Sequence, residues 1–162
     1  MSNRYQLRED LISIGDDFWI VDESGQRVFR VDGKVLRISK TFVFEDMAGT
    51  PLCRIKEQLL TVRDAMEIED AAGRQMAVVR KALISPLRDR WAVKVHDGPD
   101  LDVVGDILDH EYSIRQGRHK VAEVSKKWFR LTHTYGVEIA EGQNDIMILA
   151  IAVAMDAMTH EK

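Results

Sequence analysis

The stretch Ile146-Met147-Ile148-Leu149-Ala150-Ile151-Ala152-Val153-Ala154-Met155 decides the fold of this chain. Its ten residues carry no charge and no side-chain hydrogen-bond donor, although 31% of the 162-residue chain is charged. A ten-residue helix is about 15 Å long, roughly half the thickness of a bilayer core, so it is too short to cross a membrane. A helix that is apolar on every side has to be enclosed by protein. We therefore expect a helix over about residues 145–158 that is buried in the core.

A repeat of the form apolar-x-apolar-x-Asp-x-x-Gly-x-x-apolar organises the chain before this helix. Three copies place Gly25, Gly49 and Gly73 at intervals of 24 residues. Aspartate caps the bend of such a turn and glycine accepts positive φ, so each copy predicts a β-hairpin. Similar units occur at residues 93–98, 112–117 and 137–142. Six hairpin-like units predict about twelve strands.

The hairpins and the helix together predict the fold class, which is mainly β with one buried helix. A sheet of a dozen strands rarely stays open, so it should curl into a barrel or split into a sandwich. A barrel of that size has a lumen too wide for side chains alone, and an all-apolar helix is a suitable plug. We expect one domain over residues 1–162, an antiparallel β-barrel that encloses the C-terminal α-helix. Asn144 or Asp145 is expected to cap that helix.

Composition and charge set limits on the class of partner and on the compartment. The net charge of -4 argues against general attraction to nucleic acid. Cys53 is the single cysteine and alternates with Ile55, so we expect a buried, inert thiol and a reducing cytoplasm. The first ten residues lack a long apolar run, so they do not resemble a signal peptide. We expect a cytoplasmic protein that can act at the membrane periphery and has no transmembrane span.

Basic residues are concentrated in two segments on either side of an acidic one. Residues 74–94 hold six basic residues against one acid, residues 112–130 hold six against one, and residues 95–111 hold six acids and no lysine or arginine. The two basic segments could form one surface for phosphate or anionic headgroups. The alternative is an ordinary solvated face in which basic strands pair with the acidic stretch across the sheet. The residues chosen for the candidate anionic-ligand patch are Arg88, Arg90, Lys126 and Lys127.

Motifs for catalysis and for cofactors are missing from the sequence. It contains no Gly-x-Ser-x-Gly, no Gly-x-x-x-x-Gly-Lys-Ser/Thr, no His-Glu-x-x-His and no paired-cysteine motif. Asp109-His110-Glu111 is the densest group of potential ligands, but neighbouring residues of a strand point to opposite faces. A structural or surface histidine is therefore the expectation at His110. We predict no enzyme activity, no catalytic residues, no cofactor and no metal site.

Two C-terminal segments carry a resemblance to a known family. They are Thr134-Tyr135-Gly136-Val137-Glu138-Ile139 and residues 144–156, which include the apolar stretch quoted above. Together with residues 105–114 and the Asp-x-x-Gly hairpins, they resemble the LURP-one-related family over nearly the whole chain. That family is grouped with the Tubby C-terminal-like fold and with phospholipid scramblases. The resemblance implies a twelve-stranded barrel around a hydrophobic C-terminal helix, as expected above from periodicity.

The resemblance says less about function. Tubby domains bind phosphoinositide headgroups and scramblases are membrane-associated, but the basic phosphoinositide-binding motif of Tubby proteins has no match here. We therefore take the fold from the family and no site residues. The sequence favours a non-enzymatic binding or scaffold module that recognises an anionic phospholipid headgroup or a phosphorylated small ligand. The alternative is a protein–protein interaction module that does not bind lipid.

Overall fold

A computed structural model describes residues 3–8, 17–35, 40–57, 65–81, 90–128 and 134–159. These residues form twelve β-strands and one C-terminal α-helix, α1 (Asp145–Thr159). The strands are β1 (Asn3–Arg8), β2 (Asp17–Asp22), β3 (Arg27–Val35), β4 (Lys40–Asp46), β5 (Pro51–Glu57), β6 (Ala65–Asp70), β7 (Gln75–Lys81), β8 (Arg90–Val95), β9 (Leu101–Asp106), β10 (Glu111–Gln116), β11 (His119–Ser125) and β12 (Thr134–Ile139).

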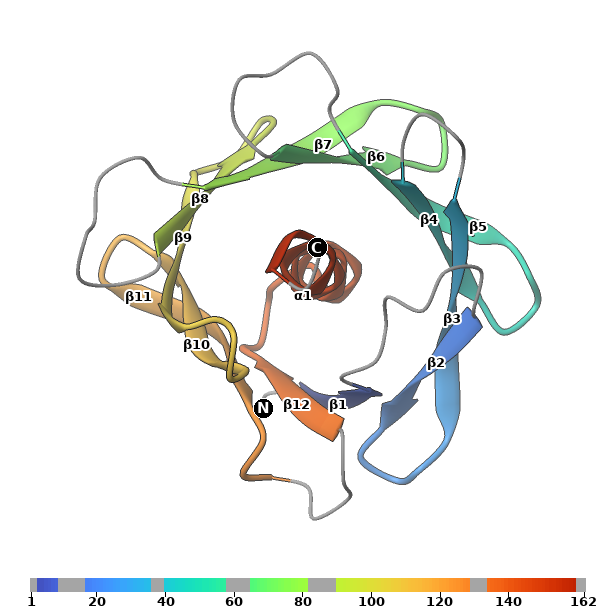
Figure 1. Ribbon diagram of the computed structural model, residues 1–162, viewed down its shortest axis with the longest axis horizontal. Coiled ribbons are helices and arrows are strands. Elements are labelled where there is room, and N and C mark those ends of the chain that lie inside the picture. The colour runs from blue at the N-terminus through green and yellow to red at the C-terminus, as the bar shows by residue number, and fades with distance from the viewer. Residues whose placement is uncertain are drawn as a thin grey trace.

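The strands form one closed antiparallel barrel, in which neighbours in sequence are neighbours in the sheet (Figure 1). β1 closes the barrel between β12 and β2. It pairs with β12 along its whole length, from Asn3↔Ile139 to Arg8↔Thr134. Its pairing with β2 is limited to Tyr5↔Asp22 and the next pair. The predicted twelve-stranded antiparallel barrel is thereby confirmed.

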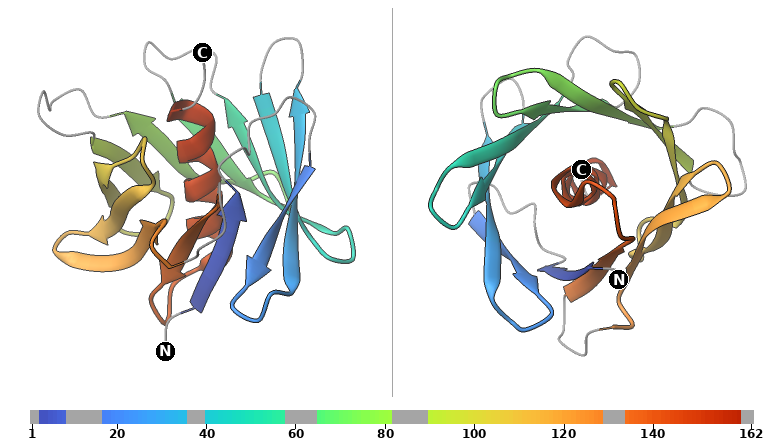
Figure 2. Two further views of the ribbon diagram at one scale, coloured as in Figure 1. Left: turned by 60° about the horizontal axis from the view of Figure 1, so that its bottom comes forward. Right: turned by 180° about the vertical axis from the view of Figure 1, so that it is seen from behind.

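The helix α1 lies inside this barrel and is surrounded by the strands (Figures 1 and 2). Asn144 caps its first turn, because its Oδ1 accepts a hydrogen bond of 3.1 Å from the N–H of Met147. Residues 148–157 of the helix are all buried. Enclosure of the apolar stretch, expected from its length and composition, is therefore confirmed.

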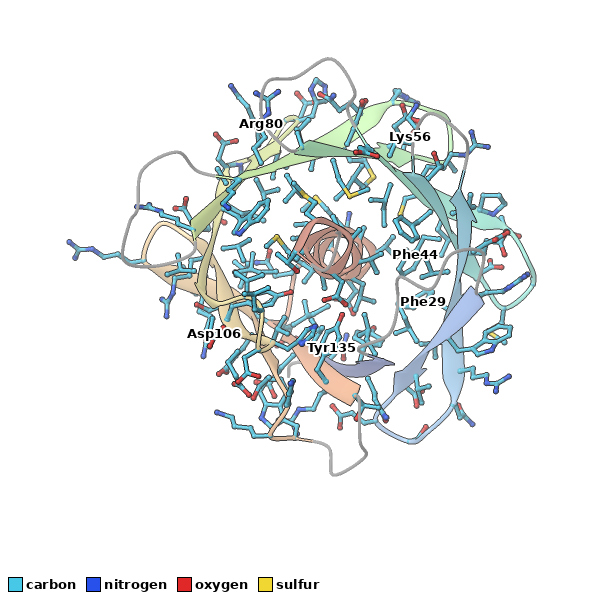
Figure 3. All side chains as sticks on the ribbon, viewed as in Figure 1. Phe29, Phe44, Lys56, Arg80, Asp106 and Tyr135 are labelled. Atoms are coloured by element: carbon cyan, nitrogen blue, oxygen red, sulfur yellow. The ribbon has the colours of Figure 1, made fainter. Side chains whose placement is uncertain are left out.

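Side chains of the barrel wall alternate between the lumen and the outside. In β8, exposed and buried residues alternate from Arg90 to Lys94, as the two-residue period of a strand requires. Figure 3 shows the same division elsewhere, with Phe44 and Tyr135 on the lumen side and Arg80 on the outer side. The core is thus the contact between the lumen face of the wall and α1.

The Asp-x-x-Gly turns repeat one conformation three times. Gly25, Gly49 and Gly73 have φ values of 86°, 85° and 83°, which confirms the predicted positive-φ positions. In each turn, Oδ1 of the aspartate accepts the backbone N–H groups two and four residues further on, at 2.9–3.0 Å. A bend fixed in this way also fixes the register of the two strands that it joins.

The predicted count of hairpins was wrong at the last unit. Residues 137–142 do not form a hairpin, because β12 ends at Ile139 and the chain turns at Gly142, with a φ of 86°, into α1. Five hairpins supply β2 to β11, and β1 and β12 complete the twelve strands. The hairpin repeat gave no signal for β1, which comes before the first repeat.

The up-and-down order places the hairpin turns at one end of the barrel, which we call the turn end. It carries the turns that join β2 to β3, β4 to β5, β6 to β7, β8 to β9 and β10 to β11, and the beginning of α1. Figure 2 shows the N-terminus at the turn end and the C-terminus at the opposite end.

Candidate functional site

Of the four residues predicted as an anionic-ligand patch, the three that the structure describes each lie within 4 Å of a carboxylate. Arg88 lies outside the described residues. Arg90 begins β8, and its guanidinium lies 3.7 Å from a carboxylate oxygen of Asp102 on β9. The charge of Arg90 is therefore balanced by the neighbouring strand.

Lys126 and Lys127 follow β11, and both meet carboxylates. Lys126 Nζ lies 3.2 Å from Oδ1 of Asp109. Lys127 Nζ lies 3.8 Å from Oε1 of Glu123 and 6.0 Å from the ring centroid of Trp128. Half-exposed pairs of this kind are typical of a solvated face.

The order of the strands explains these pairings. β9 and β10 lie between β8 and β11, so about 14 Å of sheet separates Arg90 from the strand that precedes Lys126. Asp102 and Asp109, the partners of these two cations, belong to the acidic stretch 95–111. Arg90 and Lys126 thus pair across the sheet with the acidic stretch, which was one of the two alternatives raised by the sequence.

A different pair of cations borders a hollow of about 290 Å³ on the outer wall. Arg80 on β7 and Lys94 on β8 are both exposed. Within the described part of the chain, neither forms an ion pair. Lys94 is directly opposite Val78, so Arg80 is its diagonal neighbour at about 7–8 Å. Figure 3 shows Arg80 on the outer side of the wall.

The rest of this hollow is apolar at its floor and mixed at its rim. Val78 faces outward but is only 6% exposed. His96 and Asp97 line the rim, with 3.3 Å between their side chains. Two unpaired cations above an apolar floor suit a phosphate group, which accepts charge-assisted hydrogen bonds from both. We call this site the Arg80–Lys94 hollow.

Sequence reasoning included Arg80 and Lys94 in the first basic segment but did not select them. The missing information was the register of β7 against β8, which places the two side chains on one face. In β8, the alternation of Arg90, Ala92 and Lys94 with apolar residues indicates which side chains point outward. It does not indicate which of them meet an acid on the next strand.

A second polar site lies inside the barrel and joins α1 to the wall. Asp156 on α1 is 2% exposed. Its Oδ1 lies 2.7 Å from Nε2 of His110, and its Oδ2 accepts a hydrogen bond from the hydroxyl of Tyr135 on β12. The rings of His110 and Tyr135 stack with 4.3 Å between their centroids. Two wall side chains therefore satisfy the carboxylate of the helix, as burial of a charged group requires.

His110 reaches the lumen because it is part of a turn and not of a strand. It lies between β9 and β10 with a φ of 54° and is 1% exposed, whereas Asp109 beside it is exposed. The sequence argument placed His110 in a strand only conditionally, and it did not identify Asp156 as a partner. Asp156 is a carboxylate in an otherwise apolar part of the helix, and this was the sequence signal for a buried polar partner on the wall.

Tyr112 on β10 adds a fourth buried polar group near this cluster. Its hydroxyl has no hydrogen-bond partner among the described residues. Burial, and then the charge of Asp156, raise the pKa of Tyr112 well above its ordinary value, so this phenol stays protonated. The side chains of His110, Tyr135 and Asp156 are at most 2% exposed. Their geometry thus fixes the position of α1 and presents no group to a ligand in solution.

Other side chains that could react or bind a metal are buried or dispersed among the described residues. Burial raises the pKa of the Cys53 thiol to about 12, and the side chain is fully buried, as predicted for an inert thiol. Over the described ranges, no three His, Cys, Asp or Glu side chains come together as a metal site. None of the described helical segments has the length and hydropathy to cross a bilayer.

These observations define a class of protein, a closed antiparallel barrel filled by an apolar helix that a buried Asp–His–Tyr cluster holds in place. The sequence profile of the LURP-one-related family matches residues 4–156, and the chain belongs to that family. The resemblance seen in the sequence is thereby confirmed.

A curated protein and a solved structure are similar to this chain. The uncharacterised protein YxjI of Bacillus subtilis (strain 168) is 23% identical over 154 residues, which are 95% of this chain and 92% of YxjI. The X-ray structure of a protein from Arabidopsis thaliana is similar with a TM-score of 0.70 and 17% identity, covering 96% of this chain and 90% of the other. At that identity the likeness concerns the fold alone.

Proposed function

We propose that this protein is a non-enzymatic binding module that holds a phosphate-bearing anion in the Arg80–Lys94 hollow. The observation that carries the proposal is the contrast among the exposed cations. Arg90, Lys126 and Lys127 each have a carboxylate within 4 Å, whereas the charges of Arg80 and Lys94 have no such partner among the described residues. Cations without a counter-charge are available to a ligand.

The lumen supports the non-enzymatic part of this proposal. The titratable side chains around Asp156 are enclosed and occupied in holding α1. The Arg80–Lys94 hollow offers two cations that can bind an anion. The thiol of Cys53 is on the lumen side and remains protonated. Binding is therefore the activity that the accessible groups support.

Two sources can supply a phosphate-bearing anion, a phospholipid headgroup or a free phosphorylated compound. A headgroup would place the protein at the cytoplasmic periphery of a membrane, because the hollow lies on the outer wall. Attraction to an anionic leaflet contributes about 1 kcal/mol for each cation near its surface. Loss of two such cations should therefore weaken binding roughly 30-fold.

The test is sedimentation with phosphatidylcholine vesicles that contain phosphatidylserine, at low and at physiological salt. The full chain is compared with the double variant Arg80→Glu/Lys94→Glu and with the control Arg90→Glu/Lys127→Glu, which has the same net charge. We expect wild type and control to bind and the Arg80/Lys94 variant to lose binding. The proposal would be wrong if both variants lost binding equally, or if the wild type bound neither vesicles nor inorganic phosphate.

Calorimetric titration of the same variants with inorganic phosphate identifies the source of the anion. If phosphate alone occupies the hollow, calorimetric titration gives saturable binding that the Arg80/Lys94 variant loses, and vesicles do not sediment the protein. If a headgroup is the ligand, phosphate competes weakly with vesicles, because it lacks the surface potential of the leaflet.

A further inference from the structure

A second hollow lies at the turn end between β1, β2 and β3. Its lining is acidic and aromatic, whereas that of the Arg80–Lys94 hollow is basic. This second hollow measures about 520 Å³, and its lining includes Tyr5, Asp22, Glu23, Val28 and Phe29. It lies where the short pairing of β1 with β2 ends, at Tyr5↔Asp22. We call it the seam hollow.

Aromatic and apolar side chains provide one part of its lining. The rings of Tyr5 and Phe29 are 6.1 Å apart between centroids and are tilted by 44°. Val28 and Phe29 are only partly buried, so apolar surface is left at the hollow. Aromatic rings that line a hollow can attract a cation, because their π-faces carry negative partial charge.

Carboxylates provide the other part. Asp22 and Glu23 line the hollow. The three hydrogen bonds that Asp22 accepts from Ser24 and Gln26 all fall on Oδ1. The hydroxyl of Ser24, followed by the N–H of Gln26, lowers the pKa of Asp22, so this group stays ionised near neutral pH.

A third carboxylate, Asp145, lies behind the aromatic side of the hollow. It accepts hydrogen bonds from the hydroxyl of Tyr5 at 2.6 Å and from Nδ2 of Asn3 at 2.9 Å. It also offsets the positive end of the α1 dipole at this end of the barrel. The Tyr5 hydroxyl is thus held between the wall and the helix, and its ring is fixed at the hollow.

The one basic residue in the lining, Arg4, does not neutralise these acids. Its guanidinium donates to Glu138 from Nε at 3.1 Å, and it stacks over the ring of Trp128 at 4.7 Å. The charge of Arg4 is thus offset by Glu138, which is not part of the lining. The seam hollow therefore keeps a negative charge.

We propose that the seam hollow binds an organic cation of the quaternary ammonium class. A diffuse, weakly hydrated cation gains from aromatic faces and from carboxylates at a distance. A compact metal ion needs several ligands that converge, and the described residues form no group of that kind. This inference does not depend on the Arg80–Lys94 hollow, which lies on other strands.

Calorimetric titration of the full chain with choline chloride tests the proposal, at an ionic strength held constant with sodium chloride. The test variant is Glu23→Ala. The repeat supplies its matched control, because Ala71 occupies the same position of the β6–β7 turn as Glu23 does between β2 and β3. Ala71→Lys changes the net charge by the same +1 as Glu23→Ala, without touching the seam hollow.

We expect saturable binding to wild type and to Ala71→Lys, and binding about five- to tenfold weaker in Glu23→Ala. Absence of saturable binding to wild type would overturn the proposal, as would equal weakening in both variants or equal competition by sodium ions. A second arm with phosphatidylcholine vesicles identifies the source of the cation. Binding to vesicles as well as to choline assigns it to a lipid headgroup, and binding to choline alone assigns it to a soluble compound.

Discussion

Charged side chains are buried and paired in the lumen of this barrel, whereas on its outer wall they are exposed and only partly paired. In the lumen, Asp156 is buried at 2% exposure and is satisfied by His110 and Tyr135. On the outer wall, Arg90 meets its acid at 3.7 Å with both side chains at least a third exposed, and Arg80 has no acid within the described residues. A buried carboxylate must keep its partners, whereas an exposed pair contributes little to stability. Changes in the lumen should therefore alter folding, and changes on the wall should alter binding.

The largest effect is expected from removing the helix. A chain that ends at Gln143 lacks α1 and leaves the apolar lumen empty. Full burial of one Leu or Ile contributes about 1.5–3 kcal/mol, and residues 148–157 are all buried. The burial energy lost with the five large apolar side chains among them is comparable with the total stability of a typical domain, about 5–15 kcal/mol. We expect insoluble protein, measured by solubility and far-UV circular dichroism; a soluble shortened chain with the strand signal of the full protein would contradict this.

The next effect concerns the single carboxylate of the buried helix. Asp156→Ala leaves the His110 and Tyr135 side chains without their acceptor in the lumen, and we expect a loss of about 3–5 kcal/mol in the free energy of unfolding. The matched change on the outer wall is Asp102→Ala, which breaks the pair with Arg90 and should cost less than about 1 kcal/mol. Urea denaturation of both variants measures the difference, and equal costs would refute the contrast between lumen and wall.

A smaller effect is expected at the turns, which belong to neither region. Gly49 has a φ of 85°, and a Cβ added there would have no atom within 4 Å. Gly49→Val should therefore cost about 1–3 kcal/mol through backbone strain alone. Ala48→Val in the same turn serves as control and should change stability by less than about 0.5 kcal/mol. If the two thermal denaturation curves coincide, the turn does not depend on glycine.

Local patterns were sufficient to predict much of this fold. The apolar stretch predicted α1, and the 24-residue spacing of Gly25, Gly49 and Gly73 predicted three turns with the observed positive φ. Both signals depend on residues that are close in sequence. β1 was not predicted, because its place in the barrel depends on pairing with β12, more than a hundred residues away.

The candidate sites were harder to predict for the same reason. Asp156 and His110 are 46 residues apart, and their contact requires a turn at His110 that no alternation pattern shows. On the outer wall, the sequence shows where basic residues are concentrated, but it does not show which acids they pair with. The register of β8 against β9 brings Asp102 to a diagonal position beside Arg90, whereas Arg80 and Lys94 form no ion pair with a described residue.

The barrel encloses the apolar helix, so the same substitution should have a large effect in the lumen and a small one outside. Leu149 on α1 is 0% exposed and Leu108 in the β9–β10 turn is 60% exposed, so Leu149→Asp and Leu108→Asp test it with identical chemistry. We predict that Leu149→Asp lowers the free energy of unfolding by more than about 4 kcal/mol, or prevents folding. Leu108→Asp should change it by less than about 0.5 kcal/mol. A stably folded Leu149→Asp protein, with the same urea midpoint as Leu108→Asp, would contradict the enclosed helix and the fold built around it.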